Sequence, residues 1–320
     1  MCERRILVAE SQGFSGEAAA LLAQIGDVNL ADLDRATLLR HVSEADILWV
    51  RLRTRIDSEV LGAATRLKTI VTPTTGLNHI DLTEAERRGI RVLSLKGETS
   101  ILRNVRATAE HTIALILALS RPLPQAWRHV REGGWTRDLF VGSEIFRKTA
   151  GIVGYGRLGC LVAGYLACFG ARVLVCDRPN ASLRAPVSIE VVGREELLRL
   201  SDIVSVHVDL NPETAGFFGA TEFEQMKPGA LFVNTARGEL VDEPALLHAL
   251  RSHRLAGAAL DVLSGENANG MGSHPLVAYA KDHDNLLITP HIGGCTKESM
   301  QMTELFLAQK LNDSMAIGLT

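Results

Sequence analysis

Residues 151–159, GIVGYGRLG, carry the strongest structural signal in this chain of 320 residues. A strand-like run leads into the first glycine of the GxGxxG spacing, and the helix-like segment RLGCLVAGYLACFG follows. In that context Gly154 permits a tight turn, Gly156 lets backbone N–H groups approach a pyrophosphate, and Gly159 lets the helix pack closely on the strand. The stretch therefore predicts a strand, turn and helix that bind a dinucleotide.

The next strand-like run supports a nucleotide with a free ribose. RVLVCD ends in Asp177, 18 residues after the last glycine of the motif, where a carboxylate can accept hydrogen bonds from both ribose hydroxyls. Because a carboxylate repels a 2′-phosphate, the pattern favours NAD over NADP, while the adjacent Arg178 leaves NADP open. Tyr155, Arg157 and Leu158 lie between the glycines and are further candidates for cofactor contact. The alternative is an ordinary turn whose strand-end aspartate caps a helix.

Strand-like and helical segments alternate along the whole chain. Before residue 95 the strand-like runs are RILVA, DILWV, LKTIVTP and IRVLSL, separated by helical segments such as 16–25 and 81–88. From residue 150 the runs are TAGIVG, RVLVCD, DIVSVHV, ALFVNTA, LAGAALDV and NLLITPH. This alternation is typical of α/β proteins with doubly wound parallel sheets. Since the glycine motif begins only at residue 154, a complete domain is expected before the cofactor domain.

Two longer helices are expected outside the alternating strand-like and helical segments. The segment 103–120 is apolar on nearly every face between Ile113 and Leu119, as in a helix that is buried between layers or domains. The segment 297–312 carries Met300, Leu307 and Leu311 at helical spacing. It predicts one amphipathic helix at the end of the chain.

Composition and charge exclude several classes of function. The chain is 46% apolar and 22% charged, which is typical of globular proteins. With 34 basic and 37 acidic residues, its charge does not predict a nucleic-acid or membrane surface. No run reaches the roughly 18 apolar residues of a membrane span. The five scattered cysteines suggest neither a disulfide framework nor a metal site, so we expect a cytoplasmic protein with a small-molecule partner.

Three polar residues follow strands of the second domain and suggest catalysis. Arg237 follows ALFVNTA, Glu266 follows GAALDVLSG, and His291 follows NLLITP. Oxidation of an alcohol next to a carboxylate needs a cation for the acid, a base for the hydroxyl proton, and a group that orients the base. Each residue alone could be an ordinary surface or structural side chain, but the three together match these needs.

The chain resembles the D-isomer-specific 2-hydroxyacid dehydrogenase family. The matching stretches are TTGLNHIDL (74–82), NVRATAEHTIALILALSR (104–121), GIVGYGRLG (151–159), MKPGALFVNTARGELVDEPALLHAL (226–250), GAALDV (257–262) and TPHIGG (289–294). The resemblance implies a Rossmann NAD-binding domain, residues 103–291, inserted into a flavodoxin-like substrate domain, residues 1–102 and 292–320. It also implies a homodimer that interconverts a 2-keto acid and its D-2-hydroxy acid.

The resemblance assigns roles to the catalytic candidates. Arg237 would hold the substrate carboxylate and keto oxygen, His291 would be the acid or base, and Glu266 would hold the imidazole ring. Gly76 and Leu77 match a loop whose backbone N–H groups take the substrate carboxylate from the other domain.

Four more positions match cofactor contacts. Asp261 would hold the nicotinamide amide, Thr108 would line the cofactor, and Thr235 and Ala236 would lie beside it. The loop between Glu266 and His291 is longer than is usual in the family, so its effect on the site is an open question.

The identity of the substrate is left open by the sequence. Arg51 matches an arginine that faces the substrate in phosphoglycerate dehydrogenases, and Arg53 and Arg55 follow the same strand-like run. Arg103 and Arg106 flank Asn104 and are expected to add positive charge near the cleft. One hypothesis is a substrate with a second anionic group. The alternative is that these arginines are solvated or paired with nearby carboxylates.

Two other functions are compatible with the same motifs. The first is an NAD(H)-sensing binding protein, like the transcriptional corepressors that resemble this family. The second is a phosphite-type dehydrogenase, whereas formate oxidation is disfavoured because formate dehydrogenases usually carry Gln at the position of Glu266. With 320 residues, we expect no appended regulatory domain.

Overall fold

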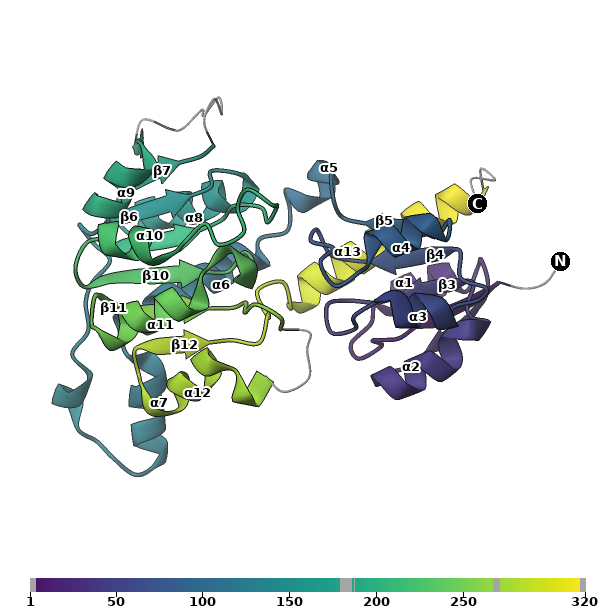
Figure 1. Ribbon diagram of the computed structural model, residues 1–320, viewed down its shortest axis with the longest axis horizontal. Coiled ribbons are helices and arrows are strands. Elements are labelled where there is room, and N and C mark those ends of the chain that lie inside the picture. Colours follow the sequence, from purple (N-terminus) through teal and green to yellow (C-terminus); the bar gives the residue numbers. More distant parts are fainter. Residues whose placement is uncertain (1–3, 179–185, 187, 267–270, 317–320) are drawn as a thin grey trace. The chain divides into compact units, whose positions relative to one another are not determined.

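The computed structural model describes residues 4–178, 186, 188–266 and 271–316. The chain divides into two compact units (Figure 1). Unit 1 comprises Met1–Val105 and Cys295–Thr320, and unit 2 comprises Arg106–Gly294. Each division lies three residues beyond the boundary expected from the sequence, at 102 and at 291.

Unit 1 is built on a parallel sheet with the strand order β2-β1-β3-β4-β5. This is the order of a flavodoxin-like sheet, so the predicted architecture of the first domain is confirmed. The strands are β1 Arg5–Val8, β2 Asp27–Leu30, β3 Ile47–Trp49, β4 Thr69–Thr72 and β5 Arg91–Ser94.

Helices cover both faces of this sheet. One face packs on α2, α3, α4 and the short η1, and the other packs on α1, α5 and the C-terminal α13. Four of the helices begin after a Ser or Asp whose side chain accepts a backbone N–H of the first turn, as expected of N-caps. The helices are α1 Gly16–Leu22, α2 Arg35–His41, η1 Val42–Glu44, α3 Ser58–Ala63, α4 Leu82–Arg87, α5 Thr99–Leu102 and α13 Lys297–Ala316.

Unit 2 is built on a parallel sheet with the strand order β12-β11-β10-β9-β6-β7-β8. The strand order reverses between β6 and β9: the strands that follow β6 are added first on one side of it and then on the other. This point is the switch point of a Rossmann fold. The predicted dinucleotide-binding architecture is therefore confirmed. The strands are β6 Thr149–Val153, β7 Arg172–Cys176, β8 Ile189–Val191, β9 Ile203–Val206, β10 Ala230–Asn234, β11 Leu255–Leu260 and β12 Leu286–Ile288.

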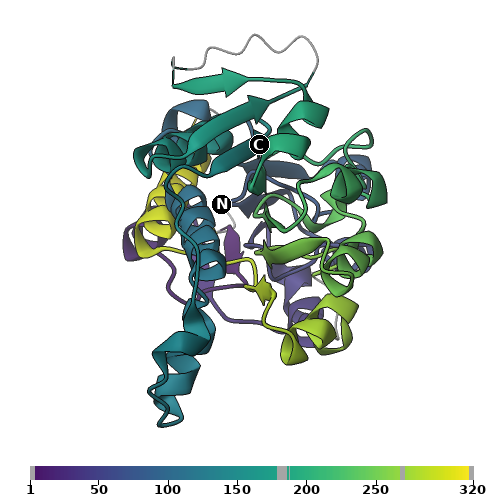
Figure 2. The same cartoon turned by 90° about the vertical axis from the view of Figure 1, so that its left-hand side faces the viewer.

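The helices of unit 2 form two layers. One face of the sheet packs on α6 and α8, and the other packs on α9, α10, α11 and α12. Helix α7 and the segment after it project from the rest of this unit (Figure 2). The helices are α6 Ala107–Ser120, α7 Leu123–Arg131, η2 Arg137–Phe140, α8 Arg157–Cys168, α9 Arg194–Leu200, α10 Ala220–Gln225, η3 Gly238–Leu240, α11 Glu243–Arg251, η4 Met271–Ser273 and α12 Pro275–Asp282.

The structure corrects the sequence analysis in two respects. The edge strands β2 and β8 were not expected, because each is short and exposes most of its residues. The predicted helix over 103–120 begins only at Ala107. A separate short helix, Thr99–Leu102, precedes it. Across the described residues, we find no helix with the length and apolar character that a bilayer crossing requires.

A buried ion pair fastens α13 into unit 1. The Oε1 atom of Glu304 accepts hydrogen bonds from Nε of Arg51 at 2.9 Å and from Nη2 at 2.5 Å. Its other oxygen accepts the backbone N–H of Ser15, the N-cap of α1, at 2.8 Å. Glu304 is fully buried, and burial raises the pKa of its carboxyl group above the usual value although Ser15 and Arg51 oppose the shift. Removing one partner would leave the other charge buried without compensation.

We expect Arg51→Ala to lower the free energy of unfolding by about 3 kcal/mol in urea titrations. The double variant Arg51→Met with Glu304→Leu should recover most of this loss, because neither charge is then left unpaired. Arg5→Ala is the control, since the Arg5–Glu44 pair is exposed and should change stability little. Equal losses in Arg51→Ala and Arg5→Ala would contradict the structural importance of the buried pair.

Candidate active site

The carboxyl ends of the parallel strands of unit 2 carry most of the predicted site residues. The glycine turn follows β6, and Asp177 follows β7. Arg237, Asp261 and His291 follow β10, β11 and β12 at the same edge of the sheet. Ligands of doubly wound sheets bind at this edge, beside the switch point.

The glycine turn has the geometry that a pyrophosphate requires. Gly154 has a positive φ of 93°, and a Cβ there would lie 2.6 Å from the carbonyl carbon of His207. A Cβ on Gly159 would lie 2.0 Å from the carbonyl oxygen of Gly154, so helix α8 can approach β6 only with glycine at this position. At Gly156, in contrast, no atom lies within 4 Å of the Cβ position. This open space before the N-terminus of α8 fits a phosphate group.

The Asp177 carboxylate is partly engaged by the same turn. Its Oδ2 accepts the backbone N–H of Tyr155 at 2.9 Å, and its Oδ1 accepts that of Arg178 at 2.7 Å. Each carboxylate oxygen can accept a second hydrogen bond, so Asp177 can still bind ribose hydroxyls. Arg157 and Leu158 lie in the first turn of α8, and burial lowers the pKa of the Arg157 guanidinium.

Three other predicted cofactor residues lie at the start of α6 and in the loop after β10. The hydroxyl of Thr112 donates to the carbonyl of Thr108 at 2.8 Å and lies 2.8 Å from the hydroxyl of Thr235. The backbone N–H of Ala236 donates to Oδ1 of Asn234 at 3.0 Å. The start of α6 is thereby tied to the loop after β10.

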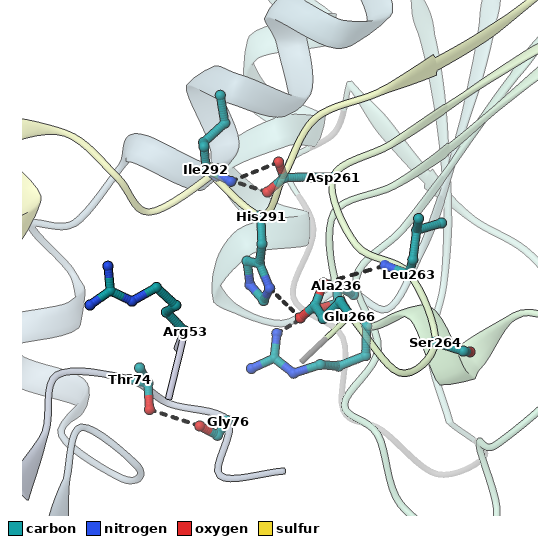
Figure 3. A network of polar contacts seen from close by, with 12 residues as sticks. Arg53, Thr74, Gly76, Ala236, Asp261, Leu263, Ser264, Glu266, His291 and Ile292 are labelled. Carbon is teal, nitrogen blue, oxygen red and sulfur yellow. Dashed lines mark hydrogen bonds and ion pairs between the residues drawn. The ribbon is translucent and has the colours of Figure 1, made fainter. Parts of the chain in front are cut away.

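The imidazole of His291 is held by Glu266. Its Nδ1 lies 2.5 Å from Oε1 of Glu266, and Figure 3 shows the two side chains pointing toward each other. Each side chain is only about a fifth exposed, at 19% and 18%. His291 has a φ of 53°, a left-handed conformation that is uncommon for a residue with a side chain. With Nδ1 occupied, Nε2 is the nitrogen that can exchange a proton with a ligand.

The turn that carries Arg237 is held by Asn234. The side-chain amide of Asn234 donates to the carbonyl of Arg237 at 2.8 Å. One guanidinium nitrogen of Arg237 donates to the carbonyl of Ala236 at 2.5 Å. In the part of the chain that the structure describes, Arg237 forms no ion pair. Most of its donors are therefore free to bind a carboxylate in a bidentate manner.

Burial and nearby carboxylates oppose each other at Arg237. Burial lowers the pKa of its guanidinium, whereas the charges of Glu266, Glu239 and Asp209 act in the opposite direction. The side chain is a cation with reduced access to water, which strengthens its attraction for an anionic ligand.

Asp261 positions the segment that carries His291. Its Oδ1 accepts the N–H of Ile292 at 2.9 Å (Figure 3). The same oxygen accepts the hydroxyl of Thr289 at 2.6 Å, and Oδ2 accepts the N–H of Gly293 at 2.7 Å. Nε2 of His111 lies 3.2 Å from the same carboxylate. Burial alone would raise the pKa of Asp261, but these hydrogen bonds hold it below its usual value. The expected contact with the nicotinamide would add to these bonds.

Sequence reasoning missed three residues that support this site. His111 and Thr289 support Asp261, although both lie within stretches that matched the family. A Cβ on Gly238 would lie 2.0 Å from the carbonyl carbon of Leu263. The glycine directly after Arg237 was the available signal, since only glycine allows the two loops to pack this closely.

The remaining predicted residues belong to unit 1. The loop after β4 contains Gly76 and Leu77, and its shape is held by the hydroxyl of Thr74, which donates to the carbonyl of Gly76 at 2.8 Å. Arg51, expected to face the substrate, instead binds Glu304 and the carbonyl of Gln12. Among the described residues, no group of three or more His, Cys, Asp or Glu side chains could hold a metal ion.

This fold and glycine turn are those of a dinucleotide-binding protein. The sequence profile described as "D-isomer specific 2-hydroxyacid dehydrogenase, NAD binding domain" matches residues 113–293. The chain belongs to the D-isomer specific 2-hydroxyacid dehydrogenase family, as the resemblance implied, and its cofactor is NAD.

Individual relatives agree with this assignment. D-3-phosphoglycerate dehydrogenase of Mycobacterium leprae is 40% identical over 284 residues, which are 88% of this chain and 52% of that protein. The crystal structure of the TT0316 protein from Thermus thermophilus is 36% identical with a TM-score of 0.79, covering 96% of this chain and 95% of that one. D-lactate dehydrogenase from Aquifex aeolicus, complexed with NAD and lactic acid, is 26% identical with a TM-score of 0.81, covering 98% and 96%. The chain spans about half the length of the curated relatives it matches.

We expect Gly156→Ala to weaken NADH binding by about tenfold or more, because the added methyl group occupies the space through which the pyrophosphate approaches. The melting temperature should not change, since no atom lies within 4 Å of the new Cβ. Fluorescence titration with NADH and thermal unfolding measure the two effects. Gly164→Ala, in the interior of the same helix and equally unhindered, is the control: it should leave NADH affinity unchanged and raise the melting temperature slightly, because alanine has the higher helix propensity. Unchanged NADH affinity in Gly156→Ala would place the cofactor elsewhere.

Proposed function

We propose that this protein is an NAD-dependent D-2-hydroxyacid dehydrogenase, which interconverts a small 2-keto acid and its D-2-hydroxy acid. The observation that carries the proposal is the 2.5 Å pair of His291 and Glu266 at the strand edge that also presents Arg237. A histidine held by a carboxylate, together with a guanidinium free to bind an acid, meets the needs of this reaction.

The chemistry of the three residues follows from their contacts. Arg237 binds the substrate carboxylate and stabilises negative charge on the keto oxygen. Bound NADH supplies the hydride to C2 of the keto acid. His291, protonated and held through Nδ1 by Glu266, donates the proton at Nε2 to the keto oxygen. In the opposite direction neutral His291 accepts the hydroxyl proton at Nε2.

The proposal is tested by following NADH absorbance with a panel of 2-keto acids: glyoxylate, hydroxypyruvate, phosphohydroxypyruvate, pyruvate, oxaloacetate and 2-oxoglutarate. We expect rapid NADH oxidation with at least one of them. His291→Asn should lower kcat by about a hundredfold or more, as expected for loss of an acid–base group, while NADH affinity is retained. Turnover equal to the wild type would overturn the role of His291.

The same panel separates the alternative functions. NADH binding without turnover of any keto acid favours an NAD(H)-sensing binding protein. Reduction of NAD by phosphite, without activity on keto acids, favours a phosphite-type dehydrogenase. Neither alternative needs the proton path through Nε2 of His291 to a keto oxygen.

The charge of the substrate is a finer question within the proposal. The names of the curated relatives support a phosphorylated substrate such as phosphohydroxypyruvate. Arg51 forms an ion pair with Glu304, and Arg53 forms one with Asp32. These pairs support a substrate whose single anionic group is the carboxylate. Comparison of kcat/KM for hydroxypyruvate and phosphohydroxypyruvate distinguishes the two.

The protein is proposed to act as a cytoplasmic homodimer with no nucleic-acid or membrane partner. The near balance of acidic and basic residues and the free thiols of the described cysteines support the compartment and the partner class. Large apolar side chains on α7 and the segment after it support the dimer, because monomers rarely expose so many together. These exposed residues are Leu123, Trp127, Val130, Trp135, Leu139 and Val141.

We expect Trp127→Glu combined with Val130→Glu to convert the homodimer to monomers, since charges replace apolar surface that a second copy would bury. Sedimentation velocity measures the change in mass. Leu30→Glu, at a similarly exposed apolar residue on β2, is the control and should leave the dimer intact. A dimer that survives the double substitution contradicts the assignment of α7 to the interface.

A further inference from the structure

We propose that Glu243 is a positioning residue for the pair of Glu266 and His291, with His274 as its support. The inference rests on the proposed dehydrogenase function and assigns a role to a second pair of carboxylate and histidine. Neither Glu243 nor His274 touches the groups proposed to react. Their effect is exerted through the backbone that carries Glu266.

The Glu243 carboxylate joins two separate segments. Glu243 is the first residue of α11, directly after the N-cap Asp242. Its Oε1 accepts the backbone N–H of Ser264 at 2.8 Å, and its Oε2 lies 3.0 Å from Nε2 of His274. The side chains of Glu243 and His274 are each 14% exposed, so water competes weakly for these contacts.

Ser264 lies inside the turn that ends in Glu266. The backbone N–H of Glu266 donates to the carbonyl of Leu263 at 3.3 Å, and the N–H of Leu263 donates to Oε2 of Glu266 at 3.4 Å. These long, weak bonds do not fix the turn by themselves. The charge-assisted bond from Ser264 to Glu243 is shorter and stronger, so it determines where the turn lies.

The turn is also held by packing. The Gly238 backbone approaches Leu263 and Ser264 so closely that a Cβ would lie 2.2 Å from the nitrogen of Ser264. Two contacts therefore hold the turn: the packing against Gly238, next to Arg237, and the bond to the carboxylate of Glu243. A change at Glu243 allows the turn to move away from Gly238 and carries Glu266 with it.

The tautomer of His274 suits its supporting role. His274 is the N-cap of α12, and its Nδ1 accepts the backbone N–H of Leu276 at 3.3 Å. An Nδ1 that accepts carries no proton, so a neutral ring has its proton on Nε2 and donates it to Glu243. The pair thus holds Glu243 without requiring a charged imidazole.

A purely structural role for Glu243 makes a different prediction. An acidic residue in the first turn stabilises a helix through its dipole, which would affect the melting temperature and not turnover. The two roles are separated by kcat measured well below the melting temperature, together with the melting temperature itself.

We expect Glu243→Ala to lower kcat for keto acid reduction by about tenfold to a hundredfold. This is the range seen when a residue that holds a functional side chain in position is removed. NADH affinity should stay within about twofold, because the glycine turn lies on other strands of the sheet. Glu243→Gln should recover part of the rate, since its amide oxygen can still accept the N–H of Ser264 while its NH2 group faces the Nε2–H donor of His274. A kcat for Glu243→Ala within twofold of the wild type overturns the proposal.

Two further variants act as controls. Asp242→Ala removes the helix cap that accepts the N–H of Ala245 at 3.1 Å but does not touch Ser264, so it should lower the melting temperature and leave kcat unchanged. His274→Asn keeps a side chain that can cap α12 and loses the bond to Glu243, so it should lower kcat in the same direction by a smaller factor. If Glu243→Ala does not fold, His274→Asn and Glu243→Gln decide the question.

Hydrogen exchange at Ser264 gives a readout that does not depend on turnover. In Glu243→Ala we expect faster exchange in the peptide that contains Ser264, measured by mass spectrometry, and no change in peptides of the glycine turn. If the wild-type protein reduces no keto acid, the dehydrogenase proposal fails. The exchange measurement at Ser264 then still tests whether Glu243 holds the turn. Unchanged exchange at Ser264 contradicts the positioning role.

Discussion

The hydrogen bonds to the buried carboxylate of Asp261 hold the rest of the active site together. Asp261 directly follows β11, and its two oxygens bind the segment from Thr289 to Gly293 that follows β12. The backbone N–H of His291 also donates to the carbonyl of Asp261 at 2.8 Å. Four bonds thus compensate for the uncommon left-handed conformation of His291. Without them, the imidazole would not be directed at a fixed point in space.

The same edge of the sheet is organised by loops that pack on one another. Asn234 shapes the turn of Arg237, Gly238 packs that turn against Leu263, and the next residues lead to Glu266. The three proposed catalytic residues therefore belong to one rigid set of contacts, although they come from three strands. Parallel strands provide this arrangement because their carboxyl ends meet at one edge.

The sequence was sufficient to predict the parts of the site that depend on local motifs. The glycine turn at 151–159 and the strand-end positions of Arg237 and His291 follow from spacing alone. The partner of Arg51 could not be predicted, because Glu304 is 253 residues away and its burial depends on how α13 packs. The edge strands β2 and β8 were missed for a related reason, since they lack the buried apolar run by which strands are recognised.

One carboxylate, that of Glu266, interacts with two side chains of the site that can carry positive charge. Arg237 is a poorly hydrated cation, and protonated His291 would be a second one beside it. Two like charges in one site would repel each other. Glu266 contacts His291 directly and also acts on Arg237 through its charge, so it offsets one of the two. In the proposed reaction, the remaining positive charge matches a single substrate carboxylate. The placement of Glu266 is consequently the feature on which both the proposed binding and the proposed proton transfer depend.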